Sequence, residues 1–313
     1  MSRYLVTGCA GFVASHLAES LLEQGHEVVA IDAFTDYYAR ELKEANVEQL
    51  RKHRRFDLIE GDLLETPIAE LIEAVDGVFH LAAQPGVRGS WGGTFAAYVR
   101  DNILASQLVF EATARAGVRV VWASSSSVYG NAEAYPTSED VQPQPISPYG
   151  VTKLACEALA RAYRTSMALD AVGLRYFTVY GPRQRPDMAF SRVTRALIDG
   201  RPFRVLGDGT QSRDVTYVGD AVSASVLAME HGRSGTLYNV GGGSEVSLAD
   251  VIALIQRLTG RDVDLRFEER AAGDVRRTSA DTRAAHTDLG WVPAVALEAG
   301  LRAQLAWVGL LPD

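Results

Sequence analysis

The chain has 313 residues, of which 47% are hydrophobic and 22% charged, and its formal net charge is −8. This length is enough for one large domain or two moderate ones with a sizeable buried core. The acidic balance argues against a nucleic-acid partner, because such binding relies on lysines and arginines that neutralise phosphates.

Cysteine content and apolar segments bear on location. Cys9 and Cys156 are too few for a disulfide framework, so a reducing cytoplasm is the expected location. The opening residues MSRYLVTG show no basic segment followed by a long apolar stretch. No window approaches the ~18 apolar residues that a membrane span needs, and no membrane partner is expected.

The first half of the chain alternates short apolar runs with segments at helical spacing. Apolar runs cover 4–6, 27–31, 57–59, 77–81 and 118–123, and helical patterns cover 15–24, 68–74 and 97–116. Strands that alternate with helices of this length form parallel sheets covered on both faces. The predicted fold class is therefore α/β, with a doubly wound parallel sheet of Rossmann type.

After the apolar run 174–177 the composition changes. A loop at 181–186 leads into short strands and helices, as expected of a smaller mixed α/β domain that binds substrate. Residues 214–218 and 237–240 again resemble sheet strands, so the two parts are predicted to interleave. The expected division is 1–178 plus about 214–240 for the cofactor domain, and 179–213 with 241–313 for the nucleotide-sugar domain.

A glycine-rich turn, TGCAGFVA at residues 7–14, joins the first strand to the first helix with the spacing G-x-x-G-x-x-A. Small residues let backbone N–H groups approach a pyrophosphate at the positive end of the helix. The motif alone is weak, because strand-to-helix turns also use glycine merely for positive φ. Asp32 ends the second strand and can accept hydrogen bonds from a ribose 2′-hydroxyl while repelling a 2′-phosphate. Together they predict NAD and not NADP.

Tyr149 and Lys153 lie four residues apart in a predicted helix, so their side chains face the same way. A tyrosine with its ordinary pKa of about 10 is a poor base at neutral pH, but an ammonium and a bound nicotinamide cation favour its phenolate. The phenolate could take a proton from a sugar hydroxyl. The spacing alone often marks a surface pair; the glycine turn and the strand-end serines of ASSSSVYG, residues 123–130, make it specific.

With these motifs, the chain resembles the extended short-chain dehydrogenase/reductase family, and within it the nucleotide-sugar 4-epimerases. The resemblance runs almost end to end, through TGCAGFVASHL, HLAAQPGVRGS, SSSSVYG, SPYGVTK, RYFTVYGPRQRPDMAF, RDVTYVGD and YNVGGGS. Its motifs are most similar to those of UDP-glucuronate 4-epimerases. The resemblance implies a tightly held NAD+, oxidation at sugar C4, rotation of the flat 4-keto intermediate, and return of the hydride to its other face.

The resemblance also implies roles for the serines. Ser125, Tyr149 and Lys153 are the implied catalytic residues, with Ser125 hydrogen-bonded to the C4 oxygen. At Ser126 and Ser127 the related 4,6-dehydratases carry Asp-Glu, and the decarboxylating synthases carry a Glu at the second position. Hydroxyls are not strong bases at C5, but they can donate hydrogen bonds to a C6 carboxylate. Ser124 fits equally well a structural role in finishing the strand.

Thr178 and Arg185 strengthen the prediction of an acidic sugar. By resemblance, Arg185 would clamp the sugar carboxylate, although a solvated loop arginine is the alternative. Arg213 matches the family arginine on the diphosphate, and its planar donors suit phosphate oxygens. The implied substrate contacts are Ser126, Ser127, Thr178, Arg185, Val205 beside the uracil, Arg213, and Asp274 and Arg276 near the ribose or diphosphate.

Loops after the third and fourth strands complete the implied cofactor site. Asp62 could meet the adenine or be solvated surface, and Asn102 is expected to position the sugar region or the nicotinamide loop. The implied cofactor contacts are Gly8, Gly11, Phe12, Val13, Asp32, Asp62, Leu63, Leu81, Ala82, Ala83, Tyr149, Lys153 and Tyr176; no metal is expected. Departures from the family pattern are Ala14 for the third glycine, Ala33 after Asp32, and an altered loop at 89–93.

The predicted activity is epimerisation of UDP-glucuronate to UDP-galacturonate. Three alternatives stay open: a UDP-glucose/UDP-galactose epimerase, a non-catalytic NAD-binding regulatory protein, and a dehydrogenase that releases NADH. The intact set of Ser125, Tyr149 and Lys153 argues against the regulatory protein. Family members are often dimers through two long helices, here expected at 97–116 and 149–167, so a homodimer is predicted.

Overall fold

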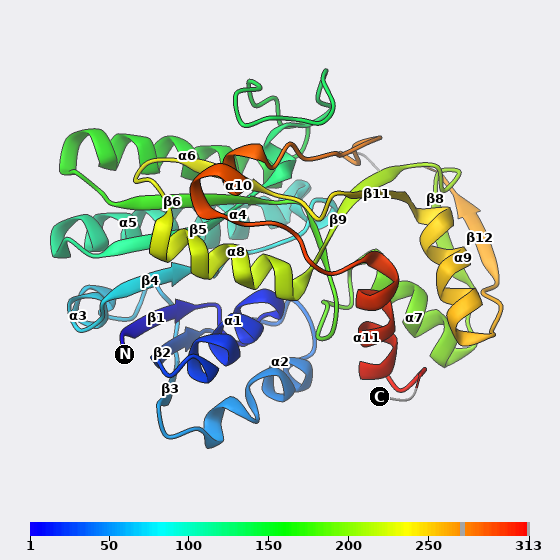
Figure 1. Cartoon of the computed structure of the whole chain (residues 1–313), viewed down its shortest axis with the longest axis horizontal. Coiled ribbons are helices and arrows are strands. Elements are labelled where there is room, and N and C mark those ends of the chain that lie inside the picture. The colour runs from blue at the N-terminus through cyan, green and yellow to red at the C-terminus, as the bar shows by residue number, and fades with distance from the viewer. Residues whose placement is uncertain (270–272, 312–313) are drawn as a thin grey trace.

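The computed structural model describes residues 1–269 and 273–311, and a large parallel sheet forms its centre (Figure 1). The strand order is β3-β2-β1-β4-β5-β6-β10, and every neighbouring pair is parallel. The strands are β1 (Arg3–Thr7), β2 (Glu27–Asp32), β3 (Phe56–Glu60), β4 (Gly77–His80), β5 (Arg119–Ser125), β6 (Ala171–Tyr176) and β10 (Leu237–Val240). The predicted doubly wound sheet is confirmed.

Helices cover both faces of this sheet. Helices α1 (Phe12–Glu23), α8 (Val218–His231) and α10 (Arg283–Leu289) pack together on one face, with α2 (Arg40–Val47) beside α1. Helices α3 (Ile68–Glu73), α5 (Ala105–Ala116) and α6 (Pro148–Met167) pack together on the other. Successive residues of β1 serve the two layers, since Val6 belongs to the core under α1 and Leu5 to the core under α5. This two-sided burial explains why the strands are almost continuously apolar.

The segment predicted as one helix at 97–116 is helical but not uniform. It begins with α4 (Phe95–Tyr98), continues through the π-helical turn η4 (Val99–Leu104), and ends as α5. Such turns widen a helix locally and often occur at functional sites. Shorter 3-10 turns are η1 (Leu50–Lys52), η2 (Arg88–Ser90), η3 (Gly92–Thr94) and η5 (Ser126–Val128).

A smaller part lies at the carboxyl ends of the central strands. Strands β7 (Thr178–Tyr180), β9 (Ser212–Tyr217) and β11 (Ser244–Ser247) form one sheet, and β8 (Phe203–Leu206) pairs with β12 (Leu265–Glu268). Helices α7 (Ala189–Asp199), α9 (Leu248–Thr259) and α11 (Leu297–Trp307) share its core. Of the segment 214–240, β9 pairs with β7 and β11, whereas α8 and β10 belong to the large sheet and its helical cover.

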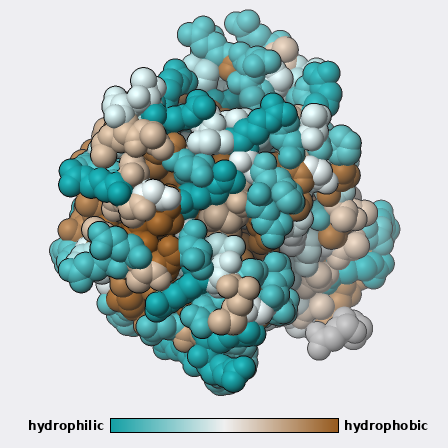
Figure 2. Space-filling view, turned by 60° about the vertical axis from the view of Figure 1, so that its left-hand side comes forward, coloured by the Kyte–Doolittle hydropathy of each residue, from teal (hydrophilic) through white to brown (hydrophobic). Residues whose placement is uncertain are grey.

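The surface mixes polar and apolar residues. On the face shown in Figure 2, hydrophobic side chains gather in patches between hydrophilic ones, most visibly in the left half of the view. Within residues 1–269 and 273–311, no helix combines the length and the apolar character needed to cross a membrane.

Candidate active site

A cavity of about 630 Å³ lies at the carboxyl edge of the large sheet. Its walls come from the turn after β1, the ends of β2 and β5, the loops after β3 and β4, and the loop between β7 and α7. It spans the junction of β1 and β4, where the chain order reverses across the sheet. Ligands of doubly wound sheets bind at this kind of switch point.

The glycine turn is shaped for close approach to a ligand. Gly8 has φ +71°, and a Cβ on it would lie 2.8 Å from the Cα of Ala82, so no larger residue fits. Helix α1 starts at Phe12, directly after Gly11, and both residues line the cavity. The helix therefore offers unpaired N–H groups and the positive end of its dipole to an anionic group such as a pyrophosphate.

Asp32 is fixed at the end of β2 by two backbone donors. Its Oδ2 accepts from the N–H of Ala10 at 2.9 Å, and its Oδ1 accepts from the N–H of Phe34 at 2.8 Å. Burial outweighs these hydrogen bonds and raises the pKa of this carboxyl. Each oxygen keeps a further lone pair for a ribose hydroxyl. The turn and Asp32 thus fit the dinucleotide expected from the sequence.

Asp62 lines the same cavity but already has protein partners. It forms an ion pair with Arg100, and its Oδ1 accepts from the N–H of Leu64 at 2.9 Å. Burial alone would raise the pKa of Asp62, but these donors prevail and the pKa is lowered. The carboxylate therefore remains ionised near the expected adenine end.

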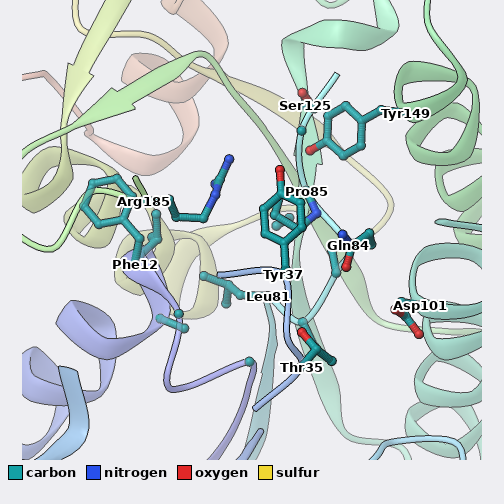
Figure 3. Close-up of a pocket in the computed structure, with 18 of the residues that line it drawn as sticks. Phe12, Thr35, Tyr37, Leu81, Gln84, Pro85, Asp101, Ser125, Tyr149 and Arg185 are labelled. Atoms are coloured by element: carbon teal, nitrogen blue, oxygen red, sulfur yellow. The ribbon is translucent and has the colours of Figure 1, made fainter. Parts of the chain in front are cut away.

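Ser125, Tyr149 and Lys153 all line the cavity. The Tyr149 hydroxyl points into it beside Ser125, opposite Phe12 and Arg185 (Figure 3). The Lys153 ammonium is buried and donates to the carbonyl of Ala123, on β5, at 2.8 Å. Ser125 Oγ accepts from the N–H of Ser127 at 3.1 Å, which leaves its own proton available for a ligand.

The first turn of α6 explains why Tyr149 stands where it does. Ser147 caps the helix by accepting from the N–H of Gly150 at 3.1 Å, and Pro148 occupies the first turn. A Cβ on Gly150 would lie 2.5 Å from the carbonyl oxygen of Ser127. Only glycine therefore allows α6 to start this close to the serine turn, which brings Tyr149 to Ser125.

The four serines separate into different environments. Ser124 donates to Glu157 at 2.7 Å, and Glu157 is paired with Arg175 at 2.7 Å in a buried ion pair. This contact matches the structural reading of Ser124. Ser126 and Ser127 lie in η5 and, unlike Ser125, do not line the cavity as the described residues shape it.

Thr178 and Arg185 lie in the cavity with the catalytic candidates. Thr178 starts β7, and Arg185 follows in the loop to α7. In Figure 3 the Arg185 side chain extends into the cavity from the side of Phe12. Its Nε and Nη2 donate to the two carboxylate oxygens of Asp187, each at 3.0 Å.

The predicted nucleotide-binding residues are spread more widely. Asp274 lines the cavity and pairs with Arg213 at 2.8 Å and Arg88 at 3.1 Å. Arg276 is bound through its N–H to the side chain of Asn131 at 3.3 Å. The Val205 side chain is buried in the core of the smaller part. Among the described residues, Val205, Arg213 and Arg276 are outside the cavity lining, and their predicted substrate contacts stay predictions.

His80 and Thr7, two structural residues behind the site, were not identified from the sequence. His80 ends β4 and bridges Thr7 Oγ1 at 2.9 Å and Ser106 Oγ at 3.1 Å. Burial, assisted by the charge of Lys153, lowers the pKa of His80 to about 3, so its ring is neutral. Thr7 Oγ1 also accepts from the N–H of Ala82 at 3.1 Å and thereby fixes the loop after β4. A polar residue that ends an apolar run was the only available signal.

Asn102, in the π-helical turn, connects that loop to α6. Its side chain exchanges hydrogen bonds with the N–H of Gln84 at 2.7 Å and its carbonyl at 3.1 Å, and donates to Thr152 at 3.0 Å. Thr152 in turn donates to the carbonyl of Tyr149 at 2.8 Å. The expected positioning role is consistent with this geometry, although its target includes the catalytic helix as well as the loop.

Tyr176, predicted to contact the cofactor, lines the cavity with part of its side chain. Its hydroxyl forms a 2.7 Å hydrogen bond with Ser225 of α8. Burial raises the pKa of Tyr176 to about 12, which keeps this hydroxyl protonated. All the other predicted cofactor contacts line the cavity as well, including Gly8, Val13, Asp32, Leu63, Leu81, Ala82 and Ala83.

Comparison with known proteins gives a family match over most of the chain. Residues 4–241 match the model of the NAD dependent epimerase/dehydratase family. A protein of Bacillus subtilis (strain 168) named as an uncharacterized UDP-glucose epimerase, YtcB, is 43% identical and covers 99% of this chain and 98% of its own. The UDP-glucuronate 4-epimerase of Thermodesulfobacterium geofontis is 34% identical, with 98% and 96% covered.

A solved structure is similar throughout. It is the UDP-glucuronic acid 4-epimerase of Bacillus cereus in complex with UDP-glucuronic acid and NAD, with 40% sequence identity and a TM-score of 0.95. The match covers 98% of this chain and 99% of the other.

Proposed function

Because the chain belongs to the NAD dependent epimerase/dehydratase family, we propose that it interconverts UDP-glucuronate and UDP-galacturonate by epimerisation at C4. The resemblance inferred from the sequence motifs is confirmed by the family match, and with it the NAD cofactor. The observation that carries the proposed substrate is Arg185, which reaches into the same cavity as Ser125 and Tyr149.

The reacting hydroxyl would lie between Ser125 and Tyr149. NAD+ held at the glycine turn and Asp32 would supply the hydride acceptor for C4 and the hydride donor for the return. Tyr149 takes the proton of the C4 hydroxyl, while Ser125 donates a hydrogen bond to the C4 oxygen. Lys153, which lies one helical turn after Tyr149 and whose ammonium donates to the carbonyl of Ala123, would place a positive charge near the phenol. On return, Tyr149 gives the proton back.

The carboxylate of the substrate needs control as well as affinity. A 4-keto uronic acid loses CO2 readily when its carboxylate stands perpendicular to the ketone. Arg185 and Thr178, which line the cavity, would hold the carboxylate near the carbonyl plane and suppress that loss. Ser126 and Ser127, which stand where related enzymes carry acids, are not strong acids, so an enolate formed in error would find no efficient proton donor at C5. Appearance of UDP-4-keto-pentose as a main product would contradict this role.

The direct test is incubation of the purified protein with UDP-glucuronate and no added coenzyme, followed by chromatography. We expect the galacturonate isomer to appear and reach a constant ratio with the starting sugar. Steady growth of NADH absorbance would instead identify a net dehydrogenase, and no exchange with any nucleotide sugar would favour the regulatory protein.

A neutral-sugar epimerase is the second candidate, and the name of the Bacillus subtilis relative favours it. The two candidates differ in what Arg185 does, because the C6 hydroxyl of UDP-glucose carries no negative charge to pair with it. A charge-assisted hydrogen bond contributes about 1.5 to 3 kcal/mol, or roughly tenfold to a hundredfold in affinity. A kcat/KM for UDP-glucose equal to or above that for UDP-glucuronate would decide for the neutral sugar.

We further propose that the protein is a homodimer through α5 and α6. Leu104, the last residue of η4 before α5, is 49% exposed, and Val151 and Met167 on α6 are 47% and 37% exposed. Apolar residues this exposed on neighbouring helices suit contact with a second copy. The cytoplasmic location stays a prediction.

A further inference from the structure

Arg185 uses only one edge of its guanidinium group within the protein. Nε and Nη2 donate to Asp187, two residues further along the same loop. No hydrogen bond from Nη1 to another residue occurs within the described chain, although the Arg185 side chain is only 20% exposed and lies in the cavity. A guanidinium has two edges that can each hold a carboxylate, so the second edge is available to a ligand.

Asp187 is in turn held from a different part of the chain. The Tyr37 hydroxyl, from the loop between β2 and α2, donates to Asp187 Oδ2 at 3.3 Å. Burial, followed by the nearby Asp187 charge, raises the pKa of Tyr37, so the hydroxyl remains a donor at neutral pH. The Tyr37 hydroxyl also lies close to Gly86, since a Cβ on Gly86 would be 2.5 Å from the hydroxyl oxygen.

These contacts join three loops around the cavity. Tyr37 stands between Arg185 and Tyr149 in the view of Figure 3, and Tyr37, Gly86, Arg185 and Asp187 all line the cavity. Arg185 would otherwise be a long side chain with many rotamers on a loop. Pairing with Asp187 restricts these rotamers and leaves Nη1 for a ligand in the cavity.

We propose that Asp187, anchored by Tyr37, is a positioning residue that orients Arg185 toward the carboxylate of an acidic sugar. This inference rests on the proposed function and deepens it. It assigns the preference for acidic over neutral nucleotide sugars partly to Asp187 and Tyr37, which need not touch the substrate. The alternative, that Asp187 competes with the substrate for Arg185, predicts the opposite effect of its removal.

The test compares Asp187→Asn with the parent protein on UDP-glucuronate and UDP-glucose. Asparagine keeps the shape but loses the charge and the two-oxygen acceptor. We expect KM and the dissociation constant for UDP-glucuronate to rise about tenfold, while kcat and the dissociation constant for UDP-glucose change less than about twofold. We also expect a larger share of UDP-4-keto-pentose. Tighter binding of UDP-glucuronate, or a parallel loss for both nucleotides, would overturn the proposal.

Two further variants separate positioning from general damage. Tyr37→Phe removes only the hydroxyl, and we expect it to shift the acid-to-neutral preference in the same direction by a smaller factor; an unchanged preference contradicts the anchor. Asp264→Asn is the matched control, because Asp264 also pairs with an arginine two residues away, Arg266, on exposed β12. It should leave the preference unchanged.

Failure of the proposed function would look different. A parent protein that does not epimerise UDP-glucuronate refutes the activity, yet the binding comparison between the two nucleotides still tests Asp187. A parent protein that is active, with Asp187→Asn retaining its acid preference, refutes the positioning role alone.

Discussion

Tyr149 depends on neighbours that fix both its place and its surroundings. The Ser147 cap and the absence of a side chain on Gly150 bring the start of α6 against the serine turn. The buried ammonium of Lys153 then lies one helical turn further on. A residue with so many restraints, whose hydroxyl forms no hydrogen bond with the described residues and points into the cavity, is suited to act on a ligand.

Replacement of Tyr149 by phenylalanine removes the proposed proton acceptor without changing the ring. We expect kcat for C4 epimerisation to fall by about 10²- to 10⁴-fold, the usual contribution of a positioned general base. NAD content after purification and thermal stability should match the parent protein, since the ring still packs near Tyr98. Epimerisation at the parental rate would exclude Tyr149 as the base.

Residue identities with a family motif were predictable from the sequence, whereas their partners were not. The motif around Tyr149 and Lys153 and the strand-end Asp32 each signal their chemistry locally. His80 and Asp187 gave no comparable signal, because their importance lies in contacts with Thr7 and Arg185. A sequence pattern cannot show that a histidine is buried between two hydroxyls.

Among the elements, the π-helical turn η4 has the clearest link to the site. It places Asn102 where one amide reaches the loop after β4 and the first turns of α6. The sequence predicts a continuous helix over 97–116, since a single extra residue in one turn leaves the apolar period nearly unchanged. The hydrogen bonds of Asn102 explain why the widened turn is kept.

Asn102→Ala would leave the backbone groups of Gln84 without partners in a part-buried place. Each such group costs about 1 to 3 kcal/mol, so we expect lower stability toward urea together with a reduced kcat. Thr152→Val is the graded control, because it removes the contact with Asn102 and the hydrogen bond to the Tyr149 carbonyl but leaves both Gln84 hydrogen bonds intact. Equal losses in the two variants would show that the Gln84 contacts are unimportant.

The strand assignments illustrate a second limit. The sequence predicts strands at 214–218 and 237–240, and both exist, but only the second joins the large sheet. A short apolar run specifies a buried strand without specifying its partners. The partners of β9 are β7 and β11, and these strands are too short to be recognised from the sequence.

At the scale of the whole molecule, the exposed apolar residues of α5 and α6 predict an assembly. A double substitution of Leu104 and Val151 by glutamate would put two charges into the proposed interface, and we expect monomers in sedimentation experiments where the parent protein sediments as a dimer. Val292→Glu is the control, since Val292 is 58% exposed away from these helices. A parent protein that is monomeric would contradict the proposal outright.

The connections between the two parts are very short. Only Phe177 separates β6 from β7, and α8 begins directly after β9. The strand that completes one edge of the large sheet, β10, is synthesised after β7, α7, β8 and β9 of the second part, whereas β11, α9, β12 and α11 follow it. If the first 180 residues were expressed alone, β6 would be an unpaired edge strand that is prone to aggregate. We therefore expect neither part of the chain to fold well without the other.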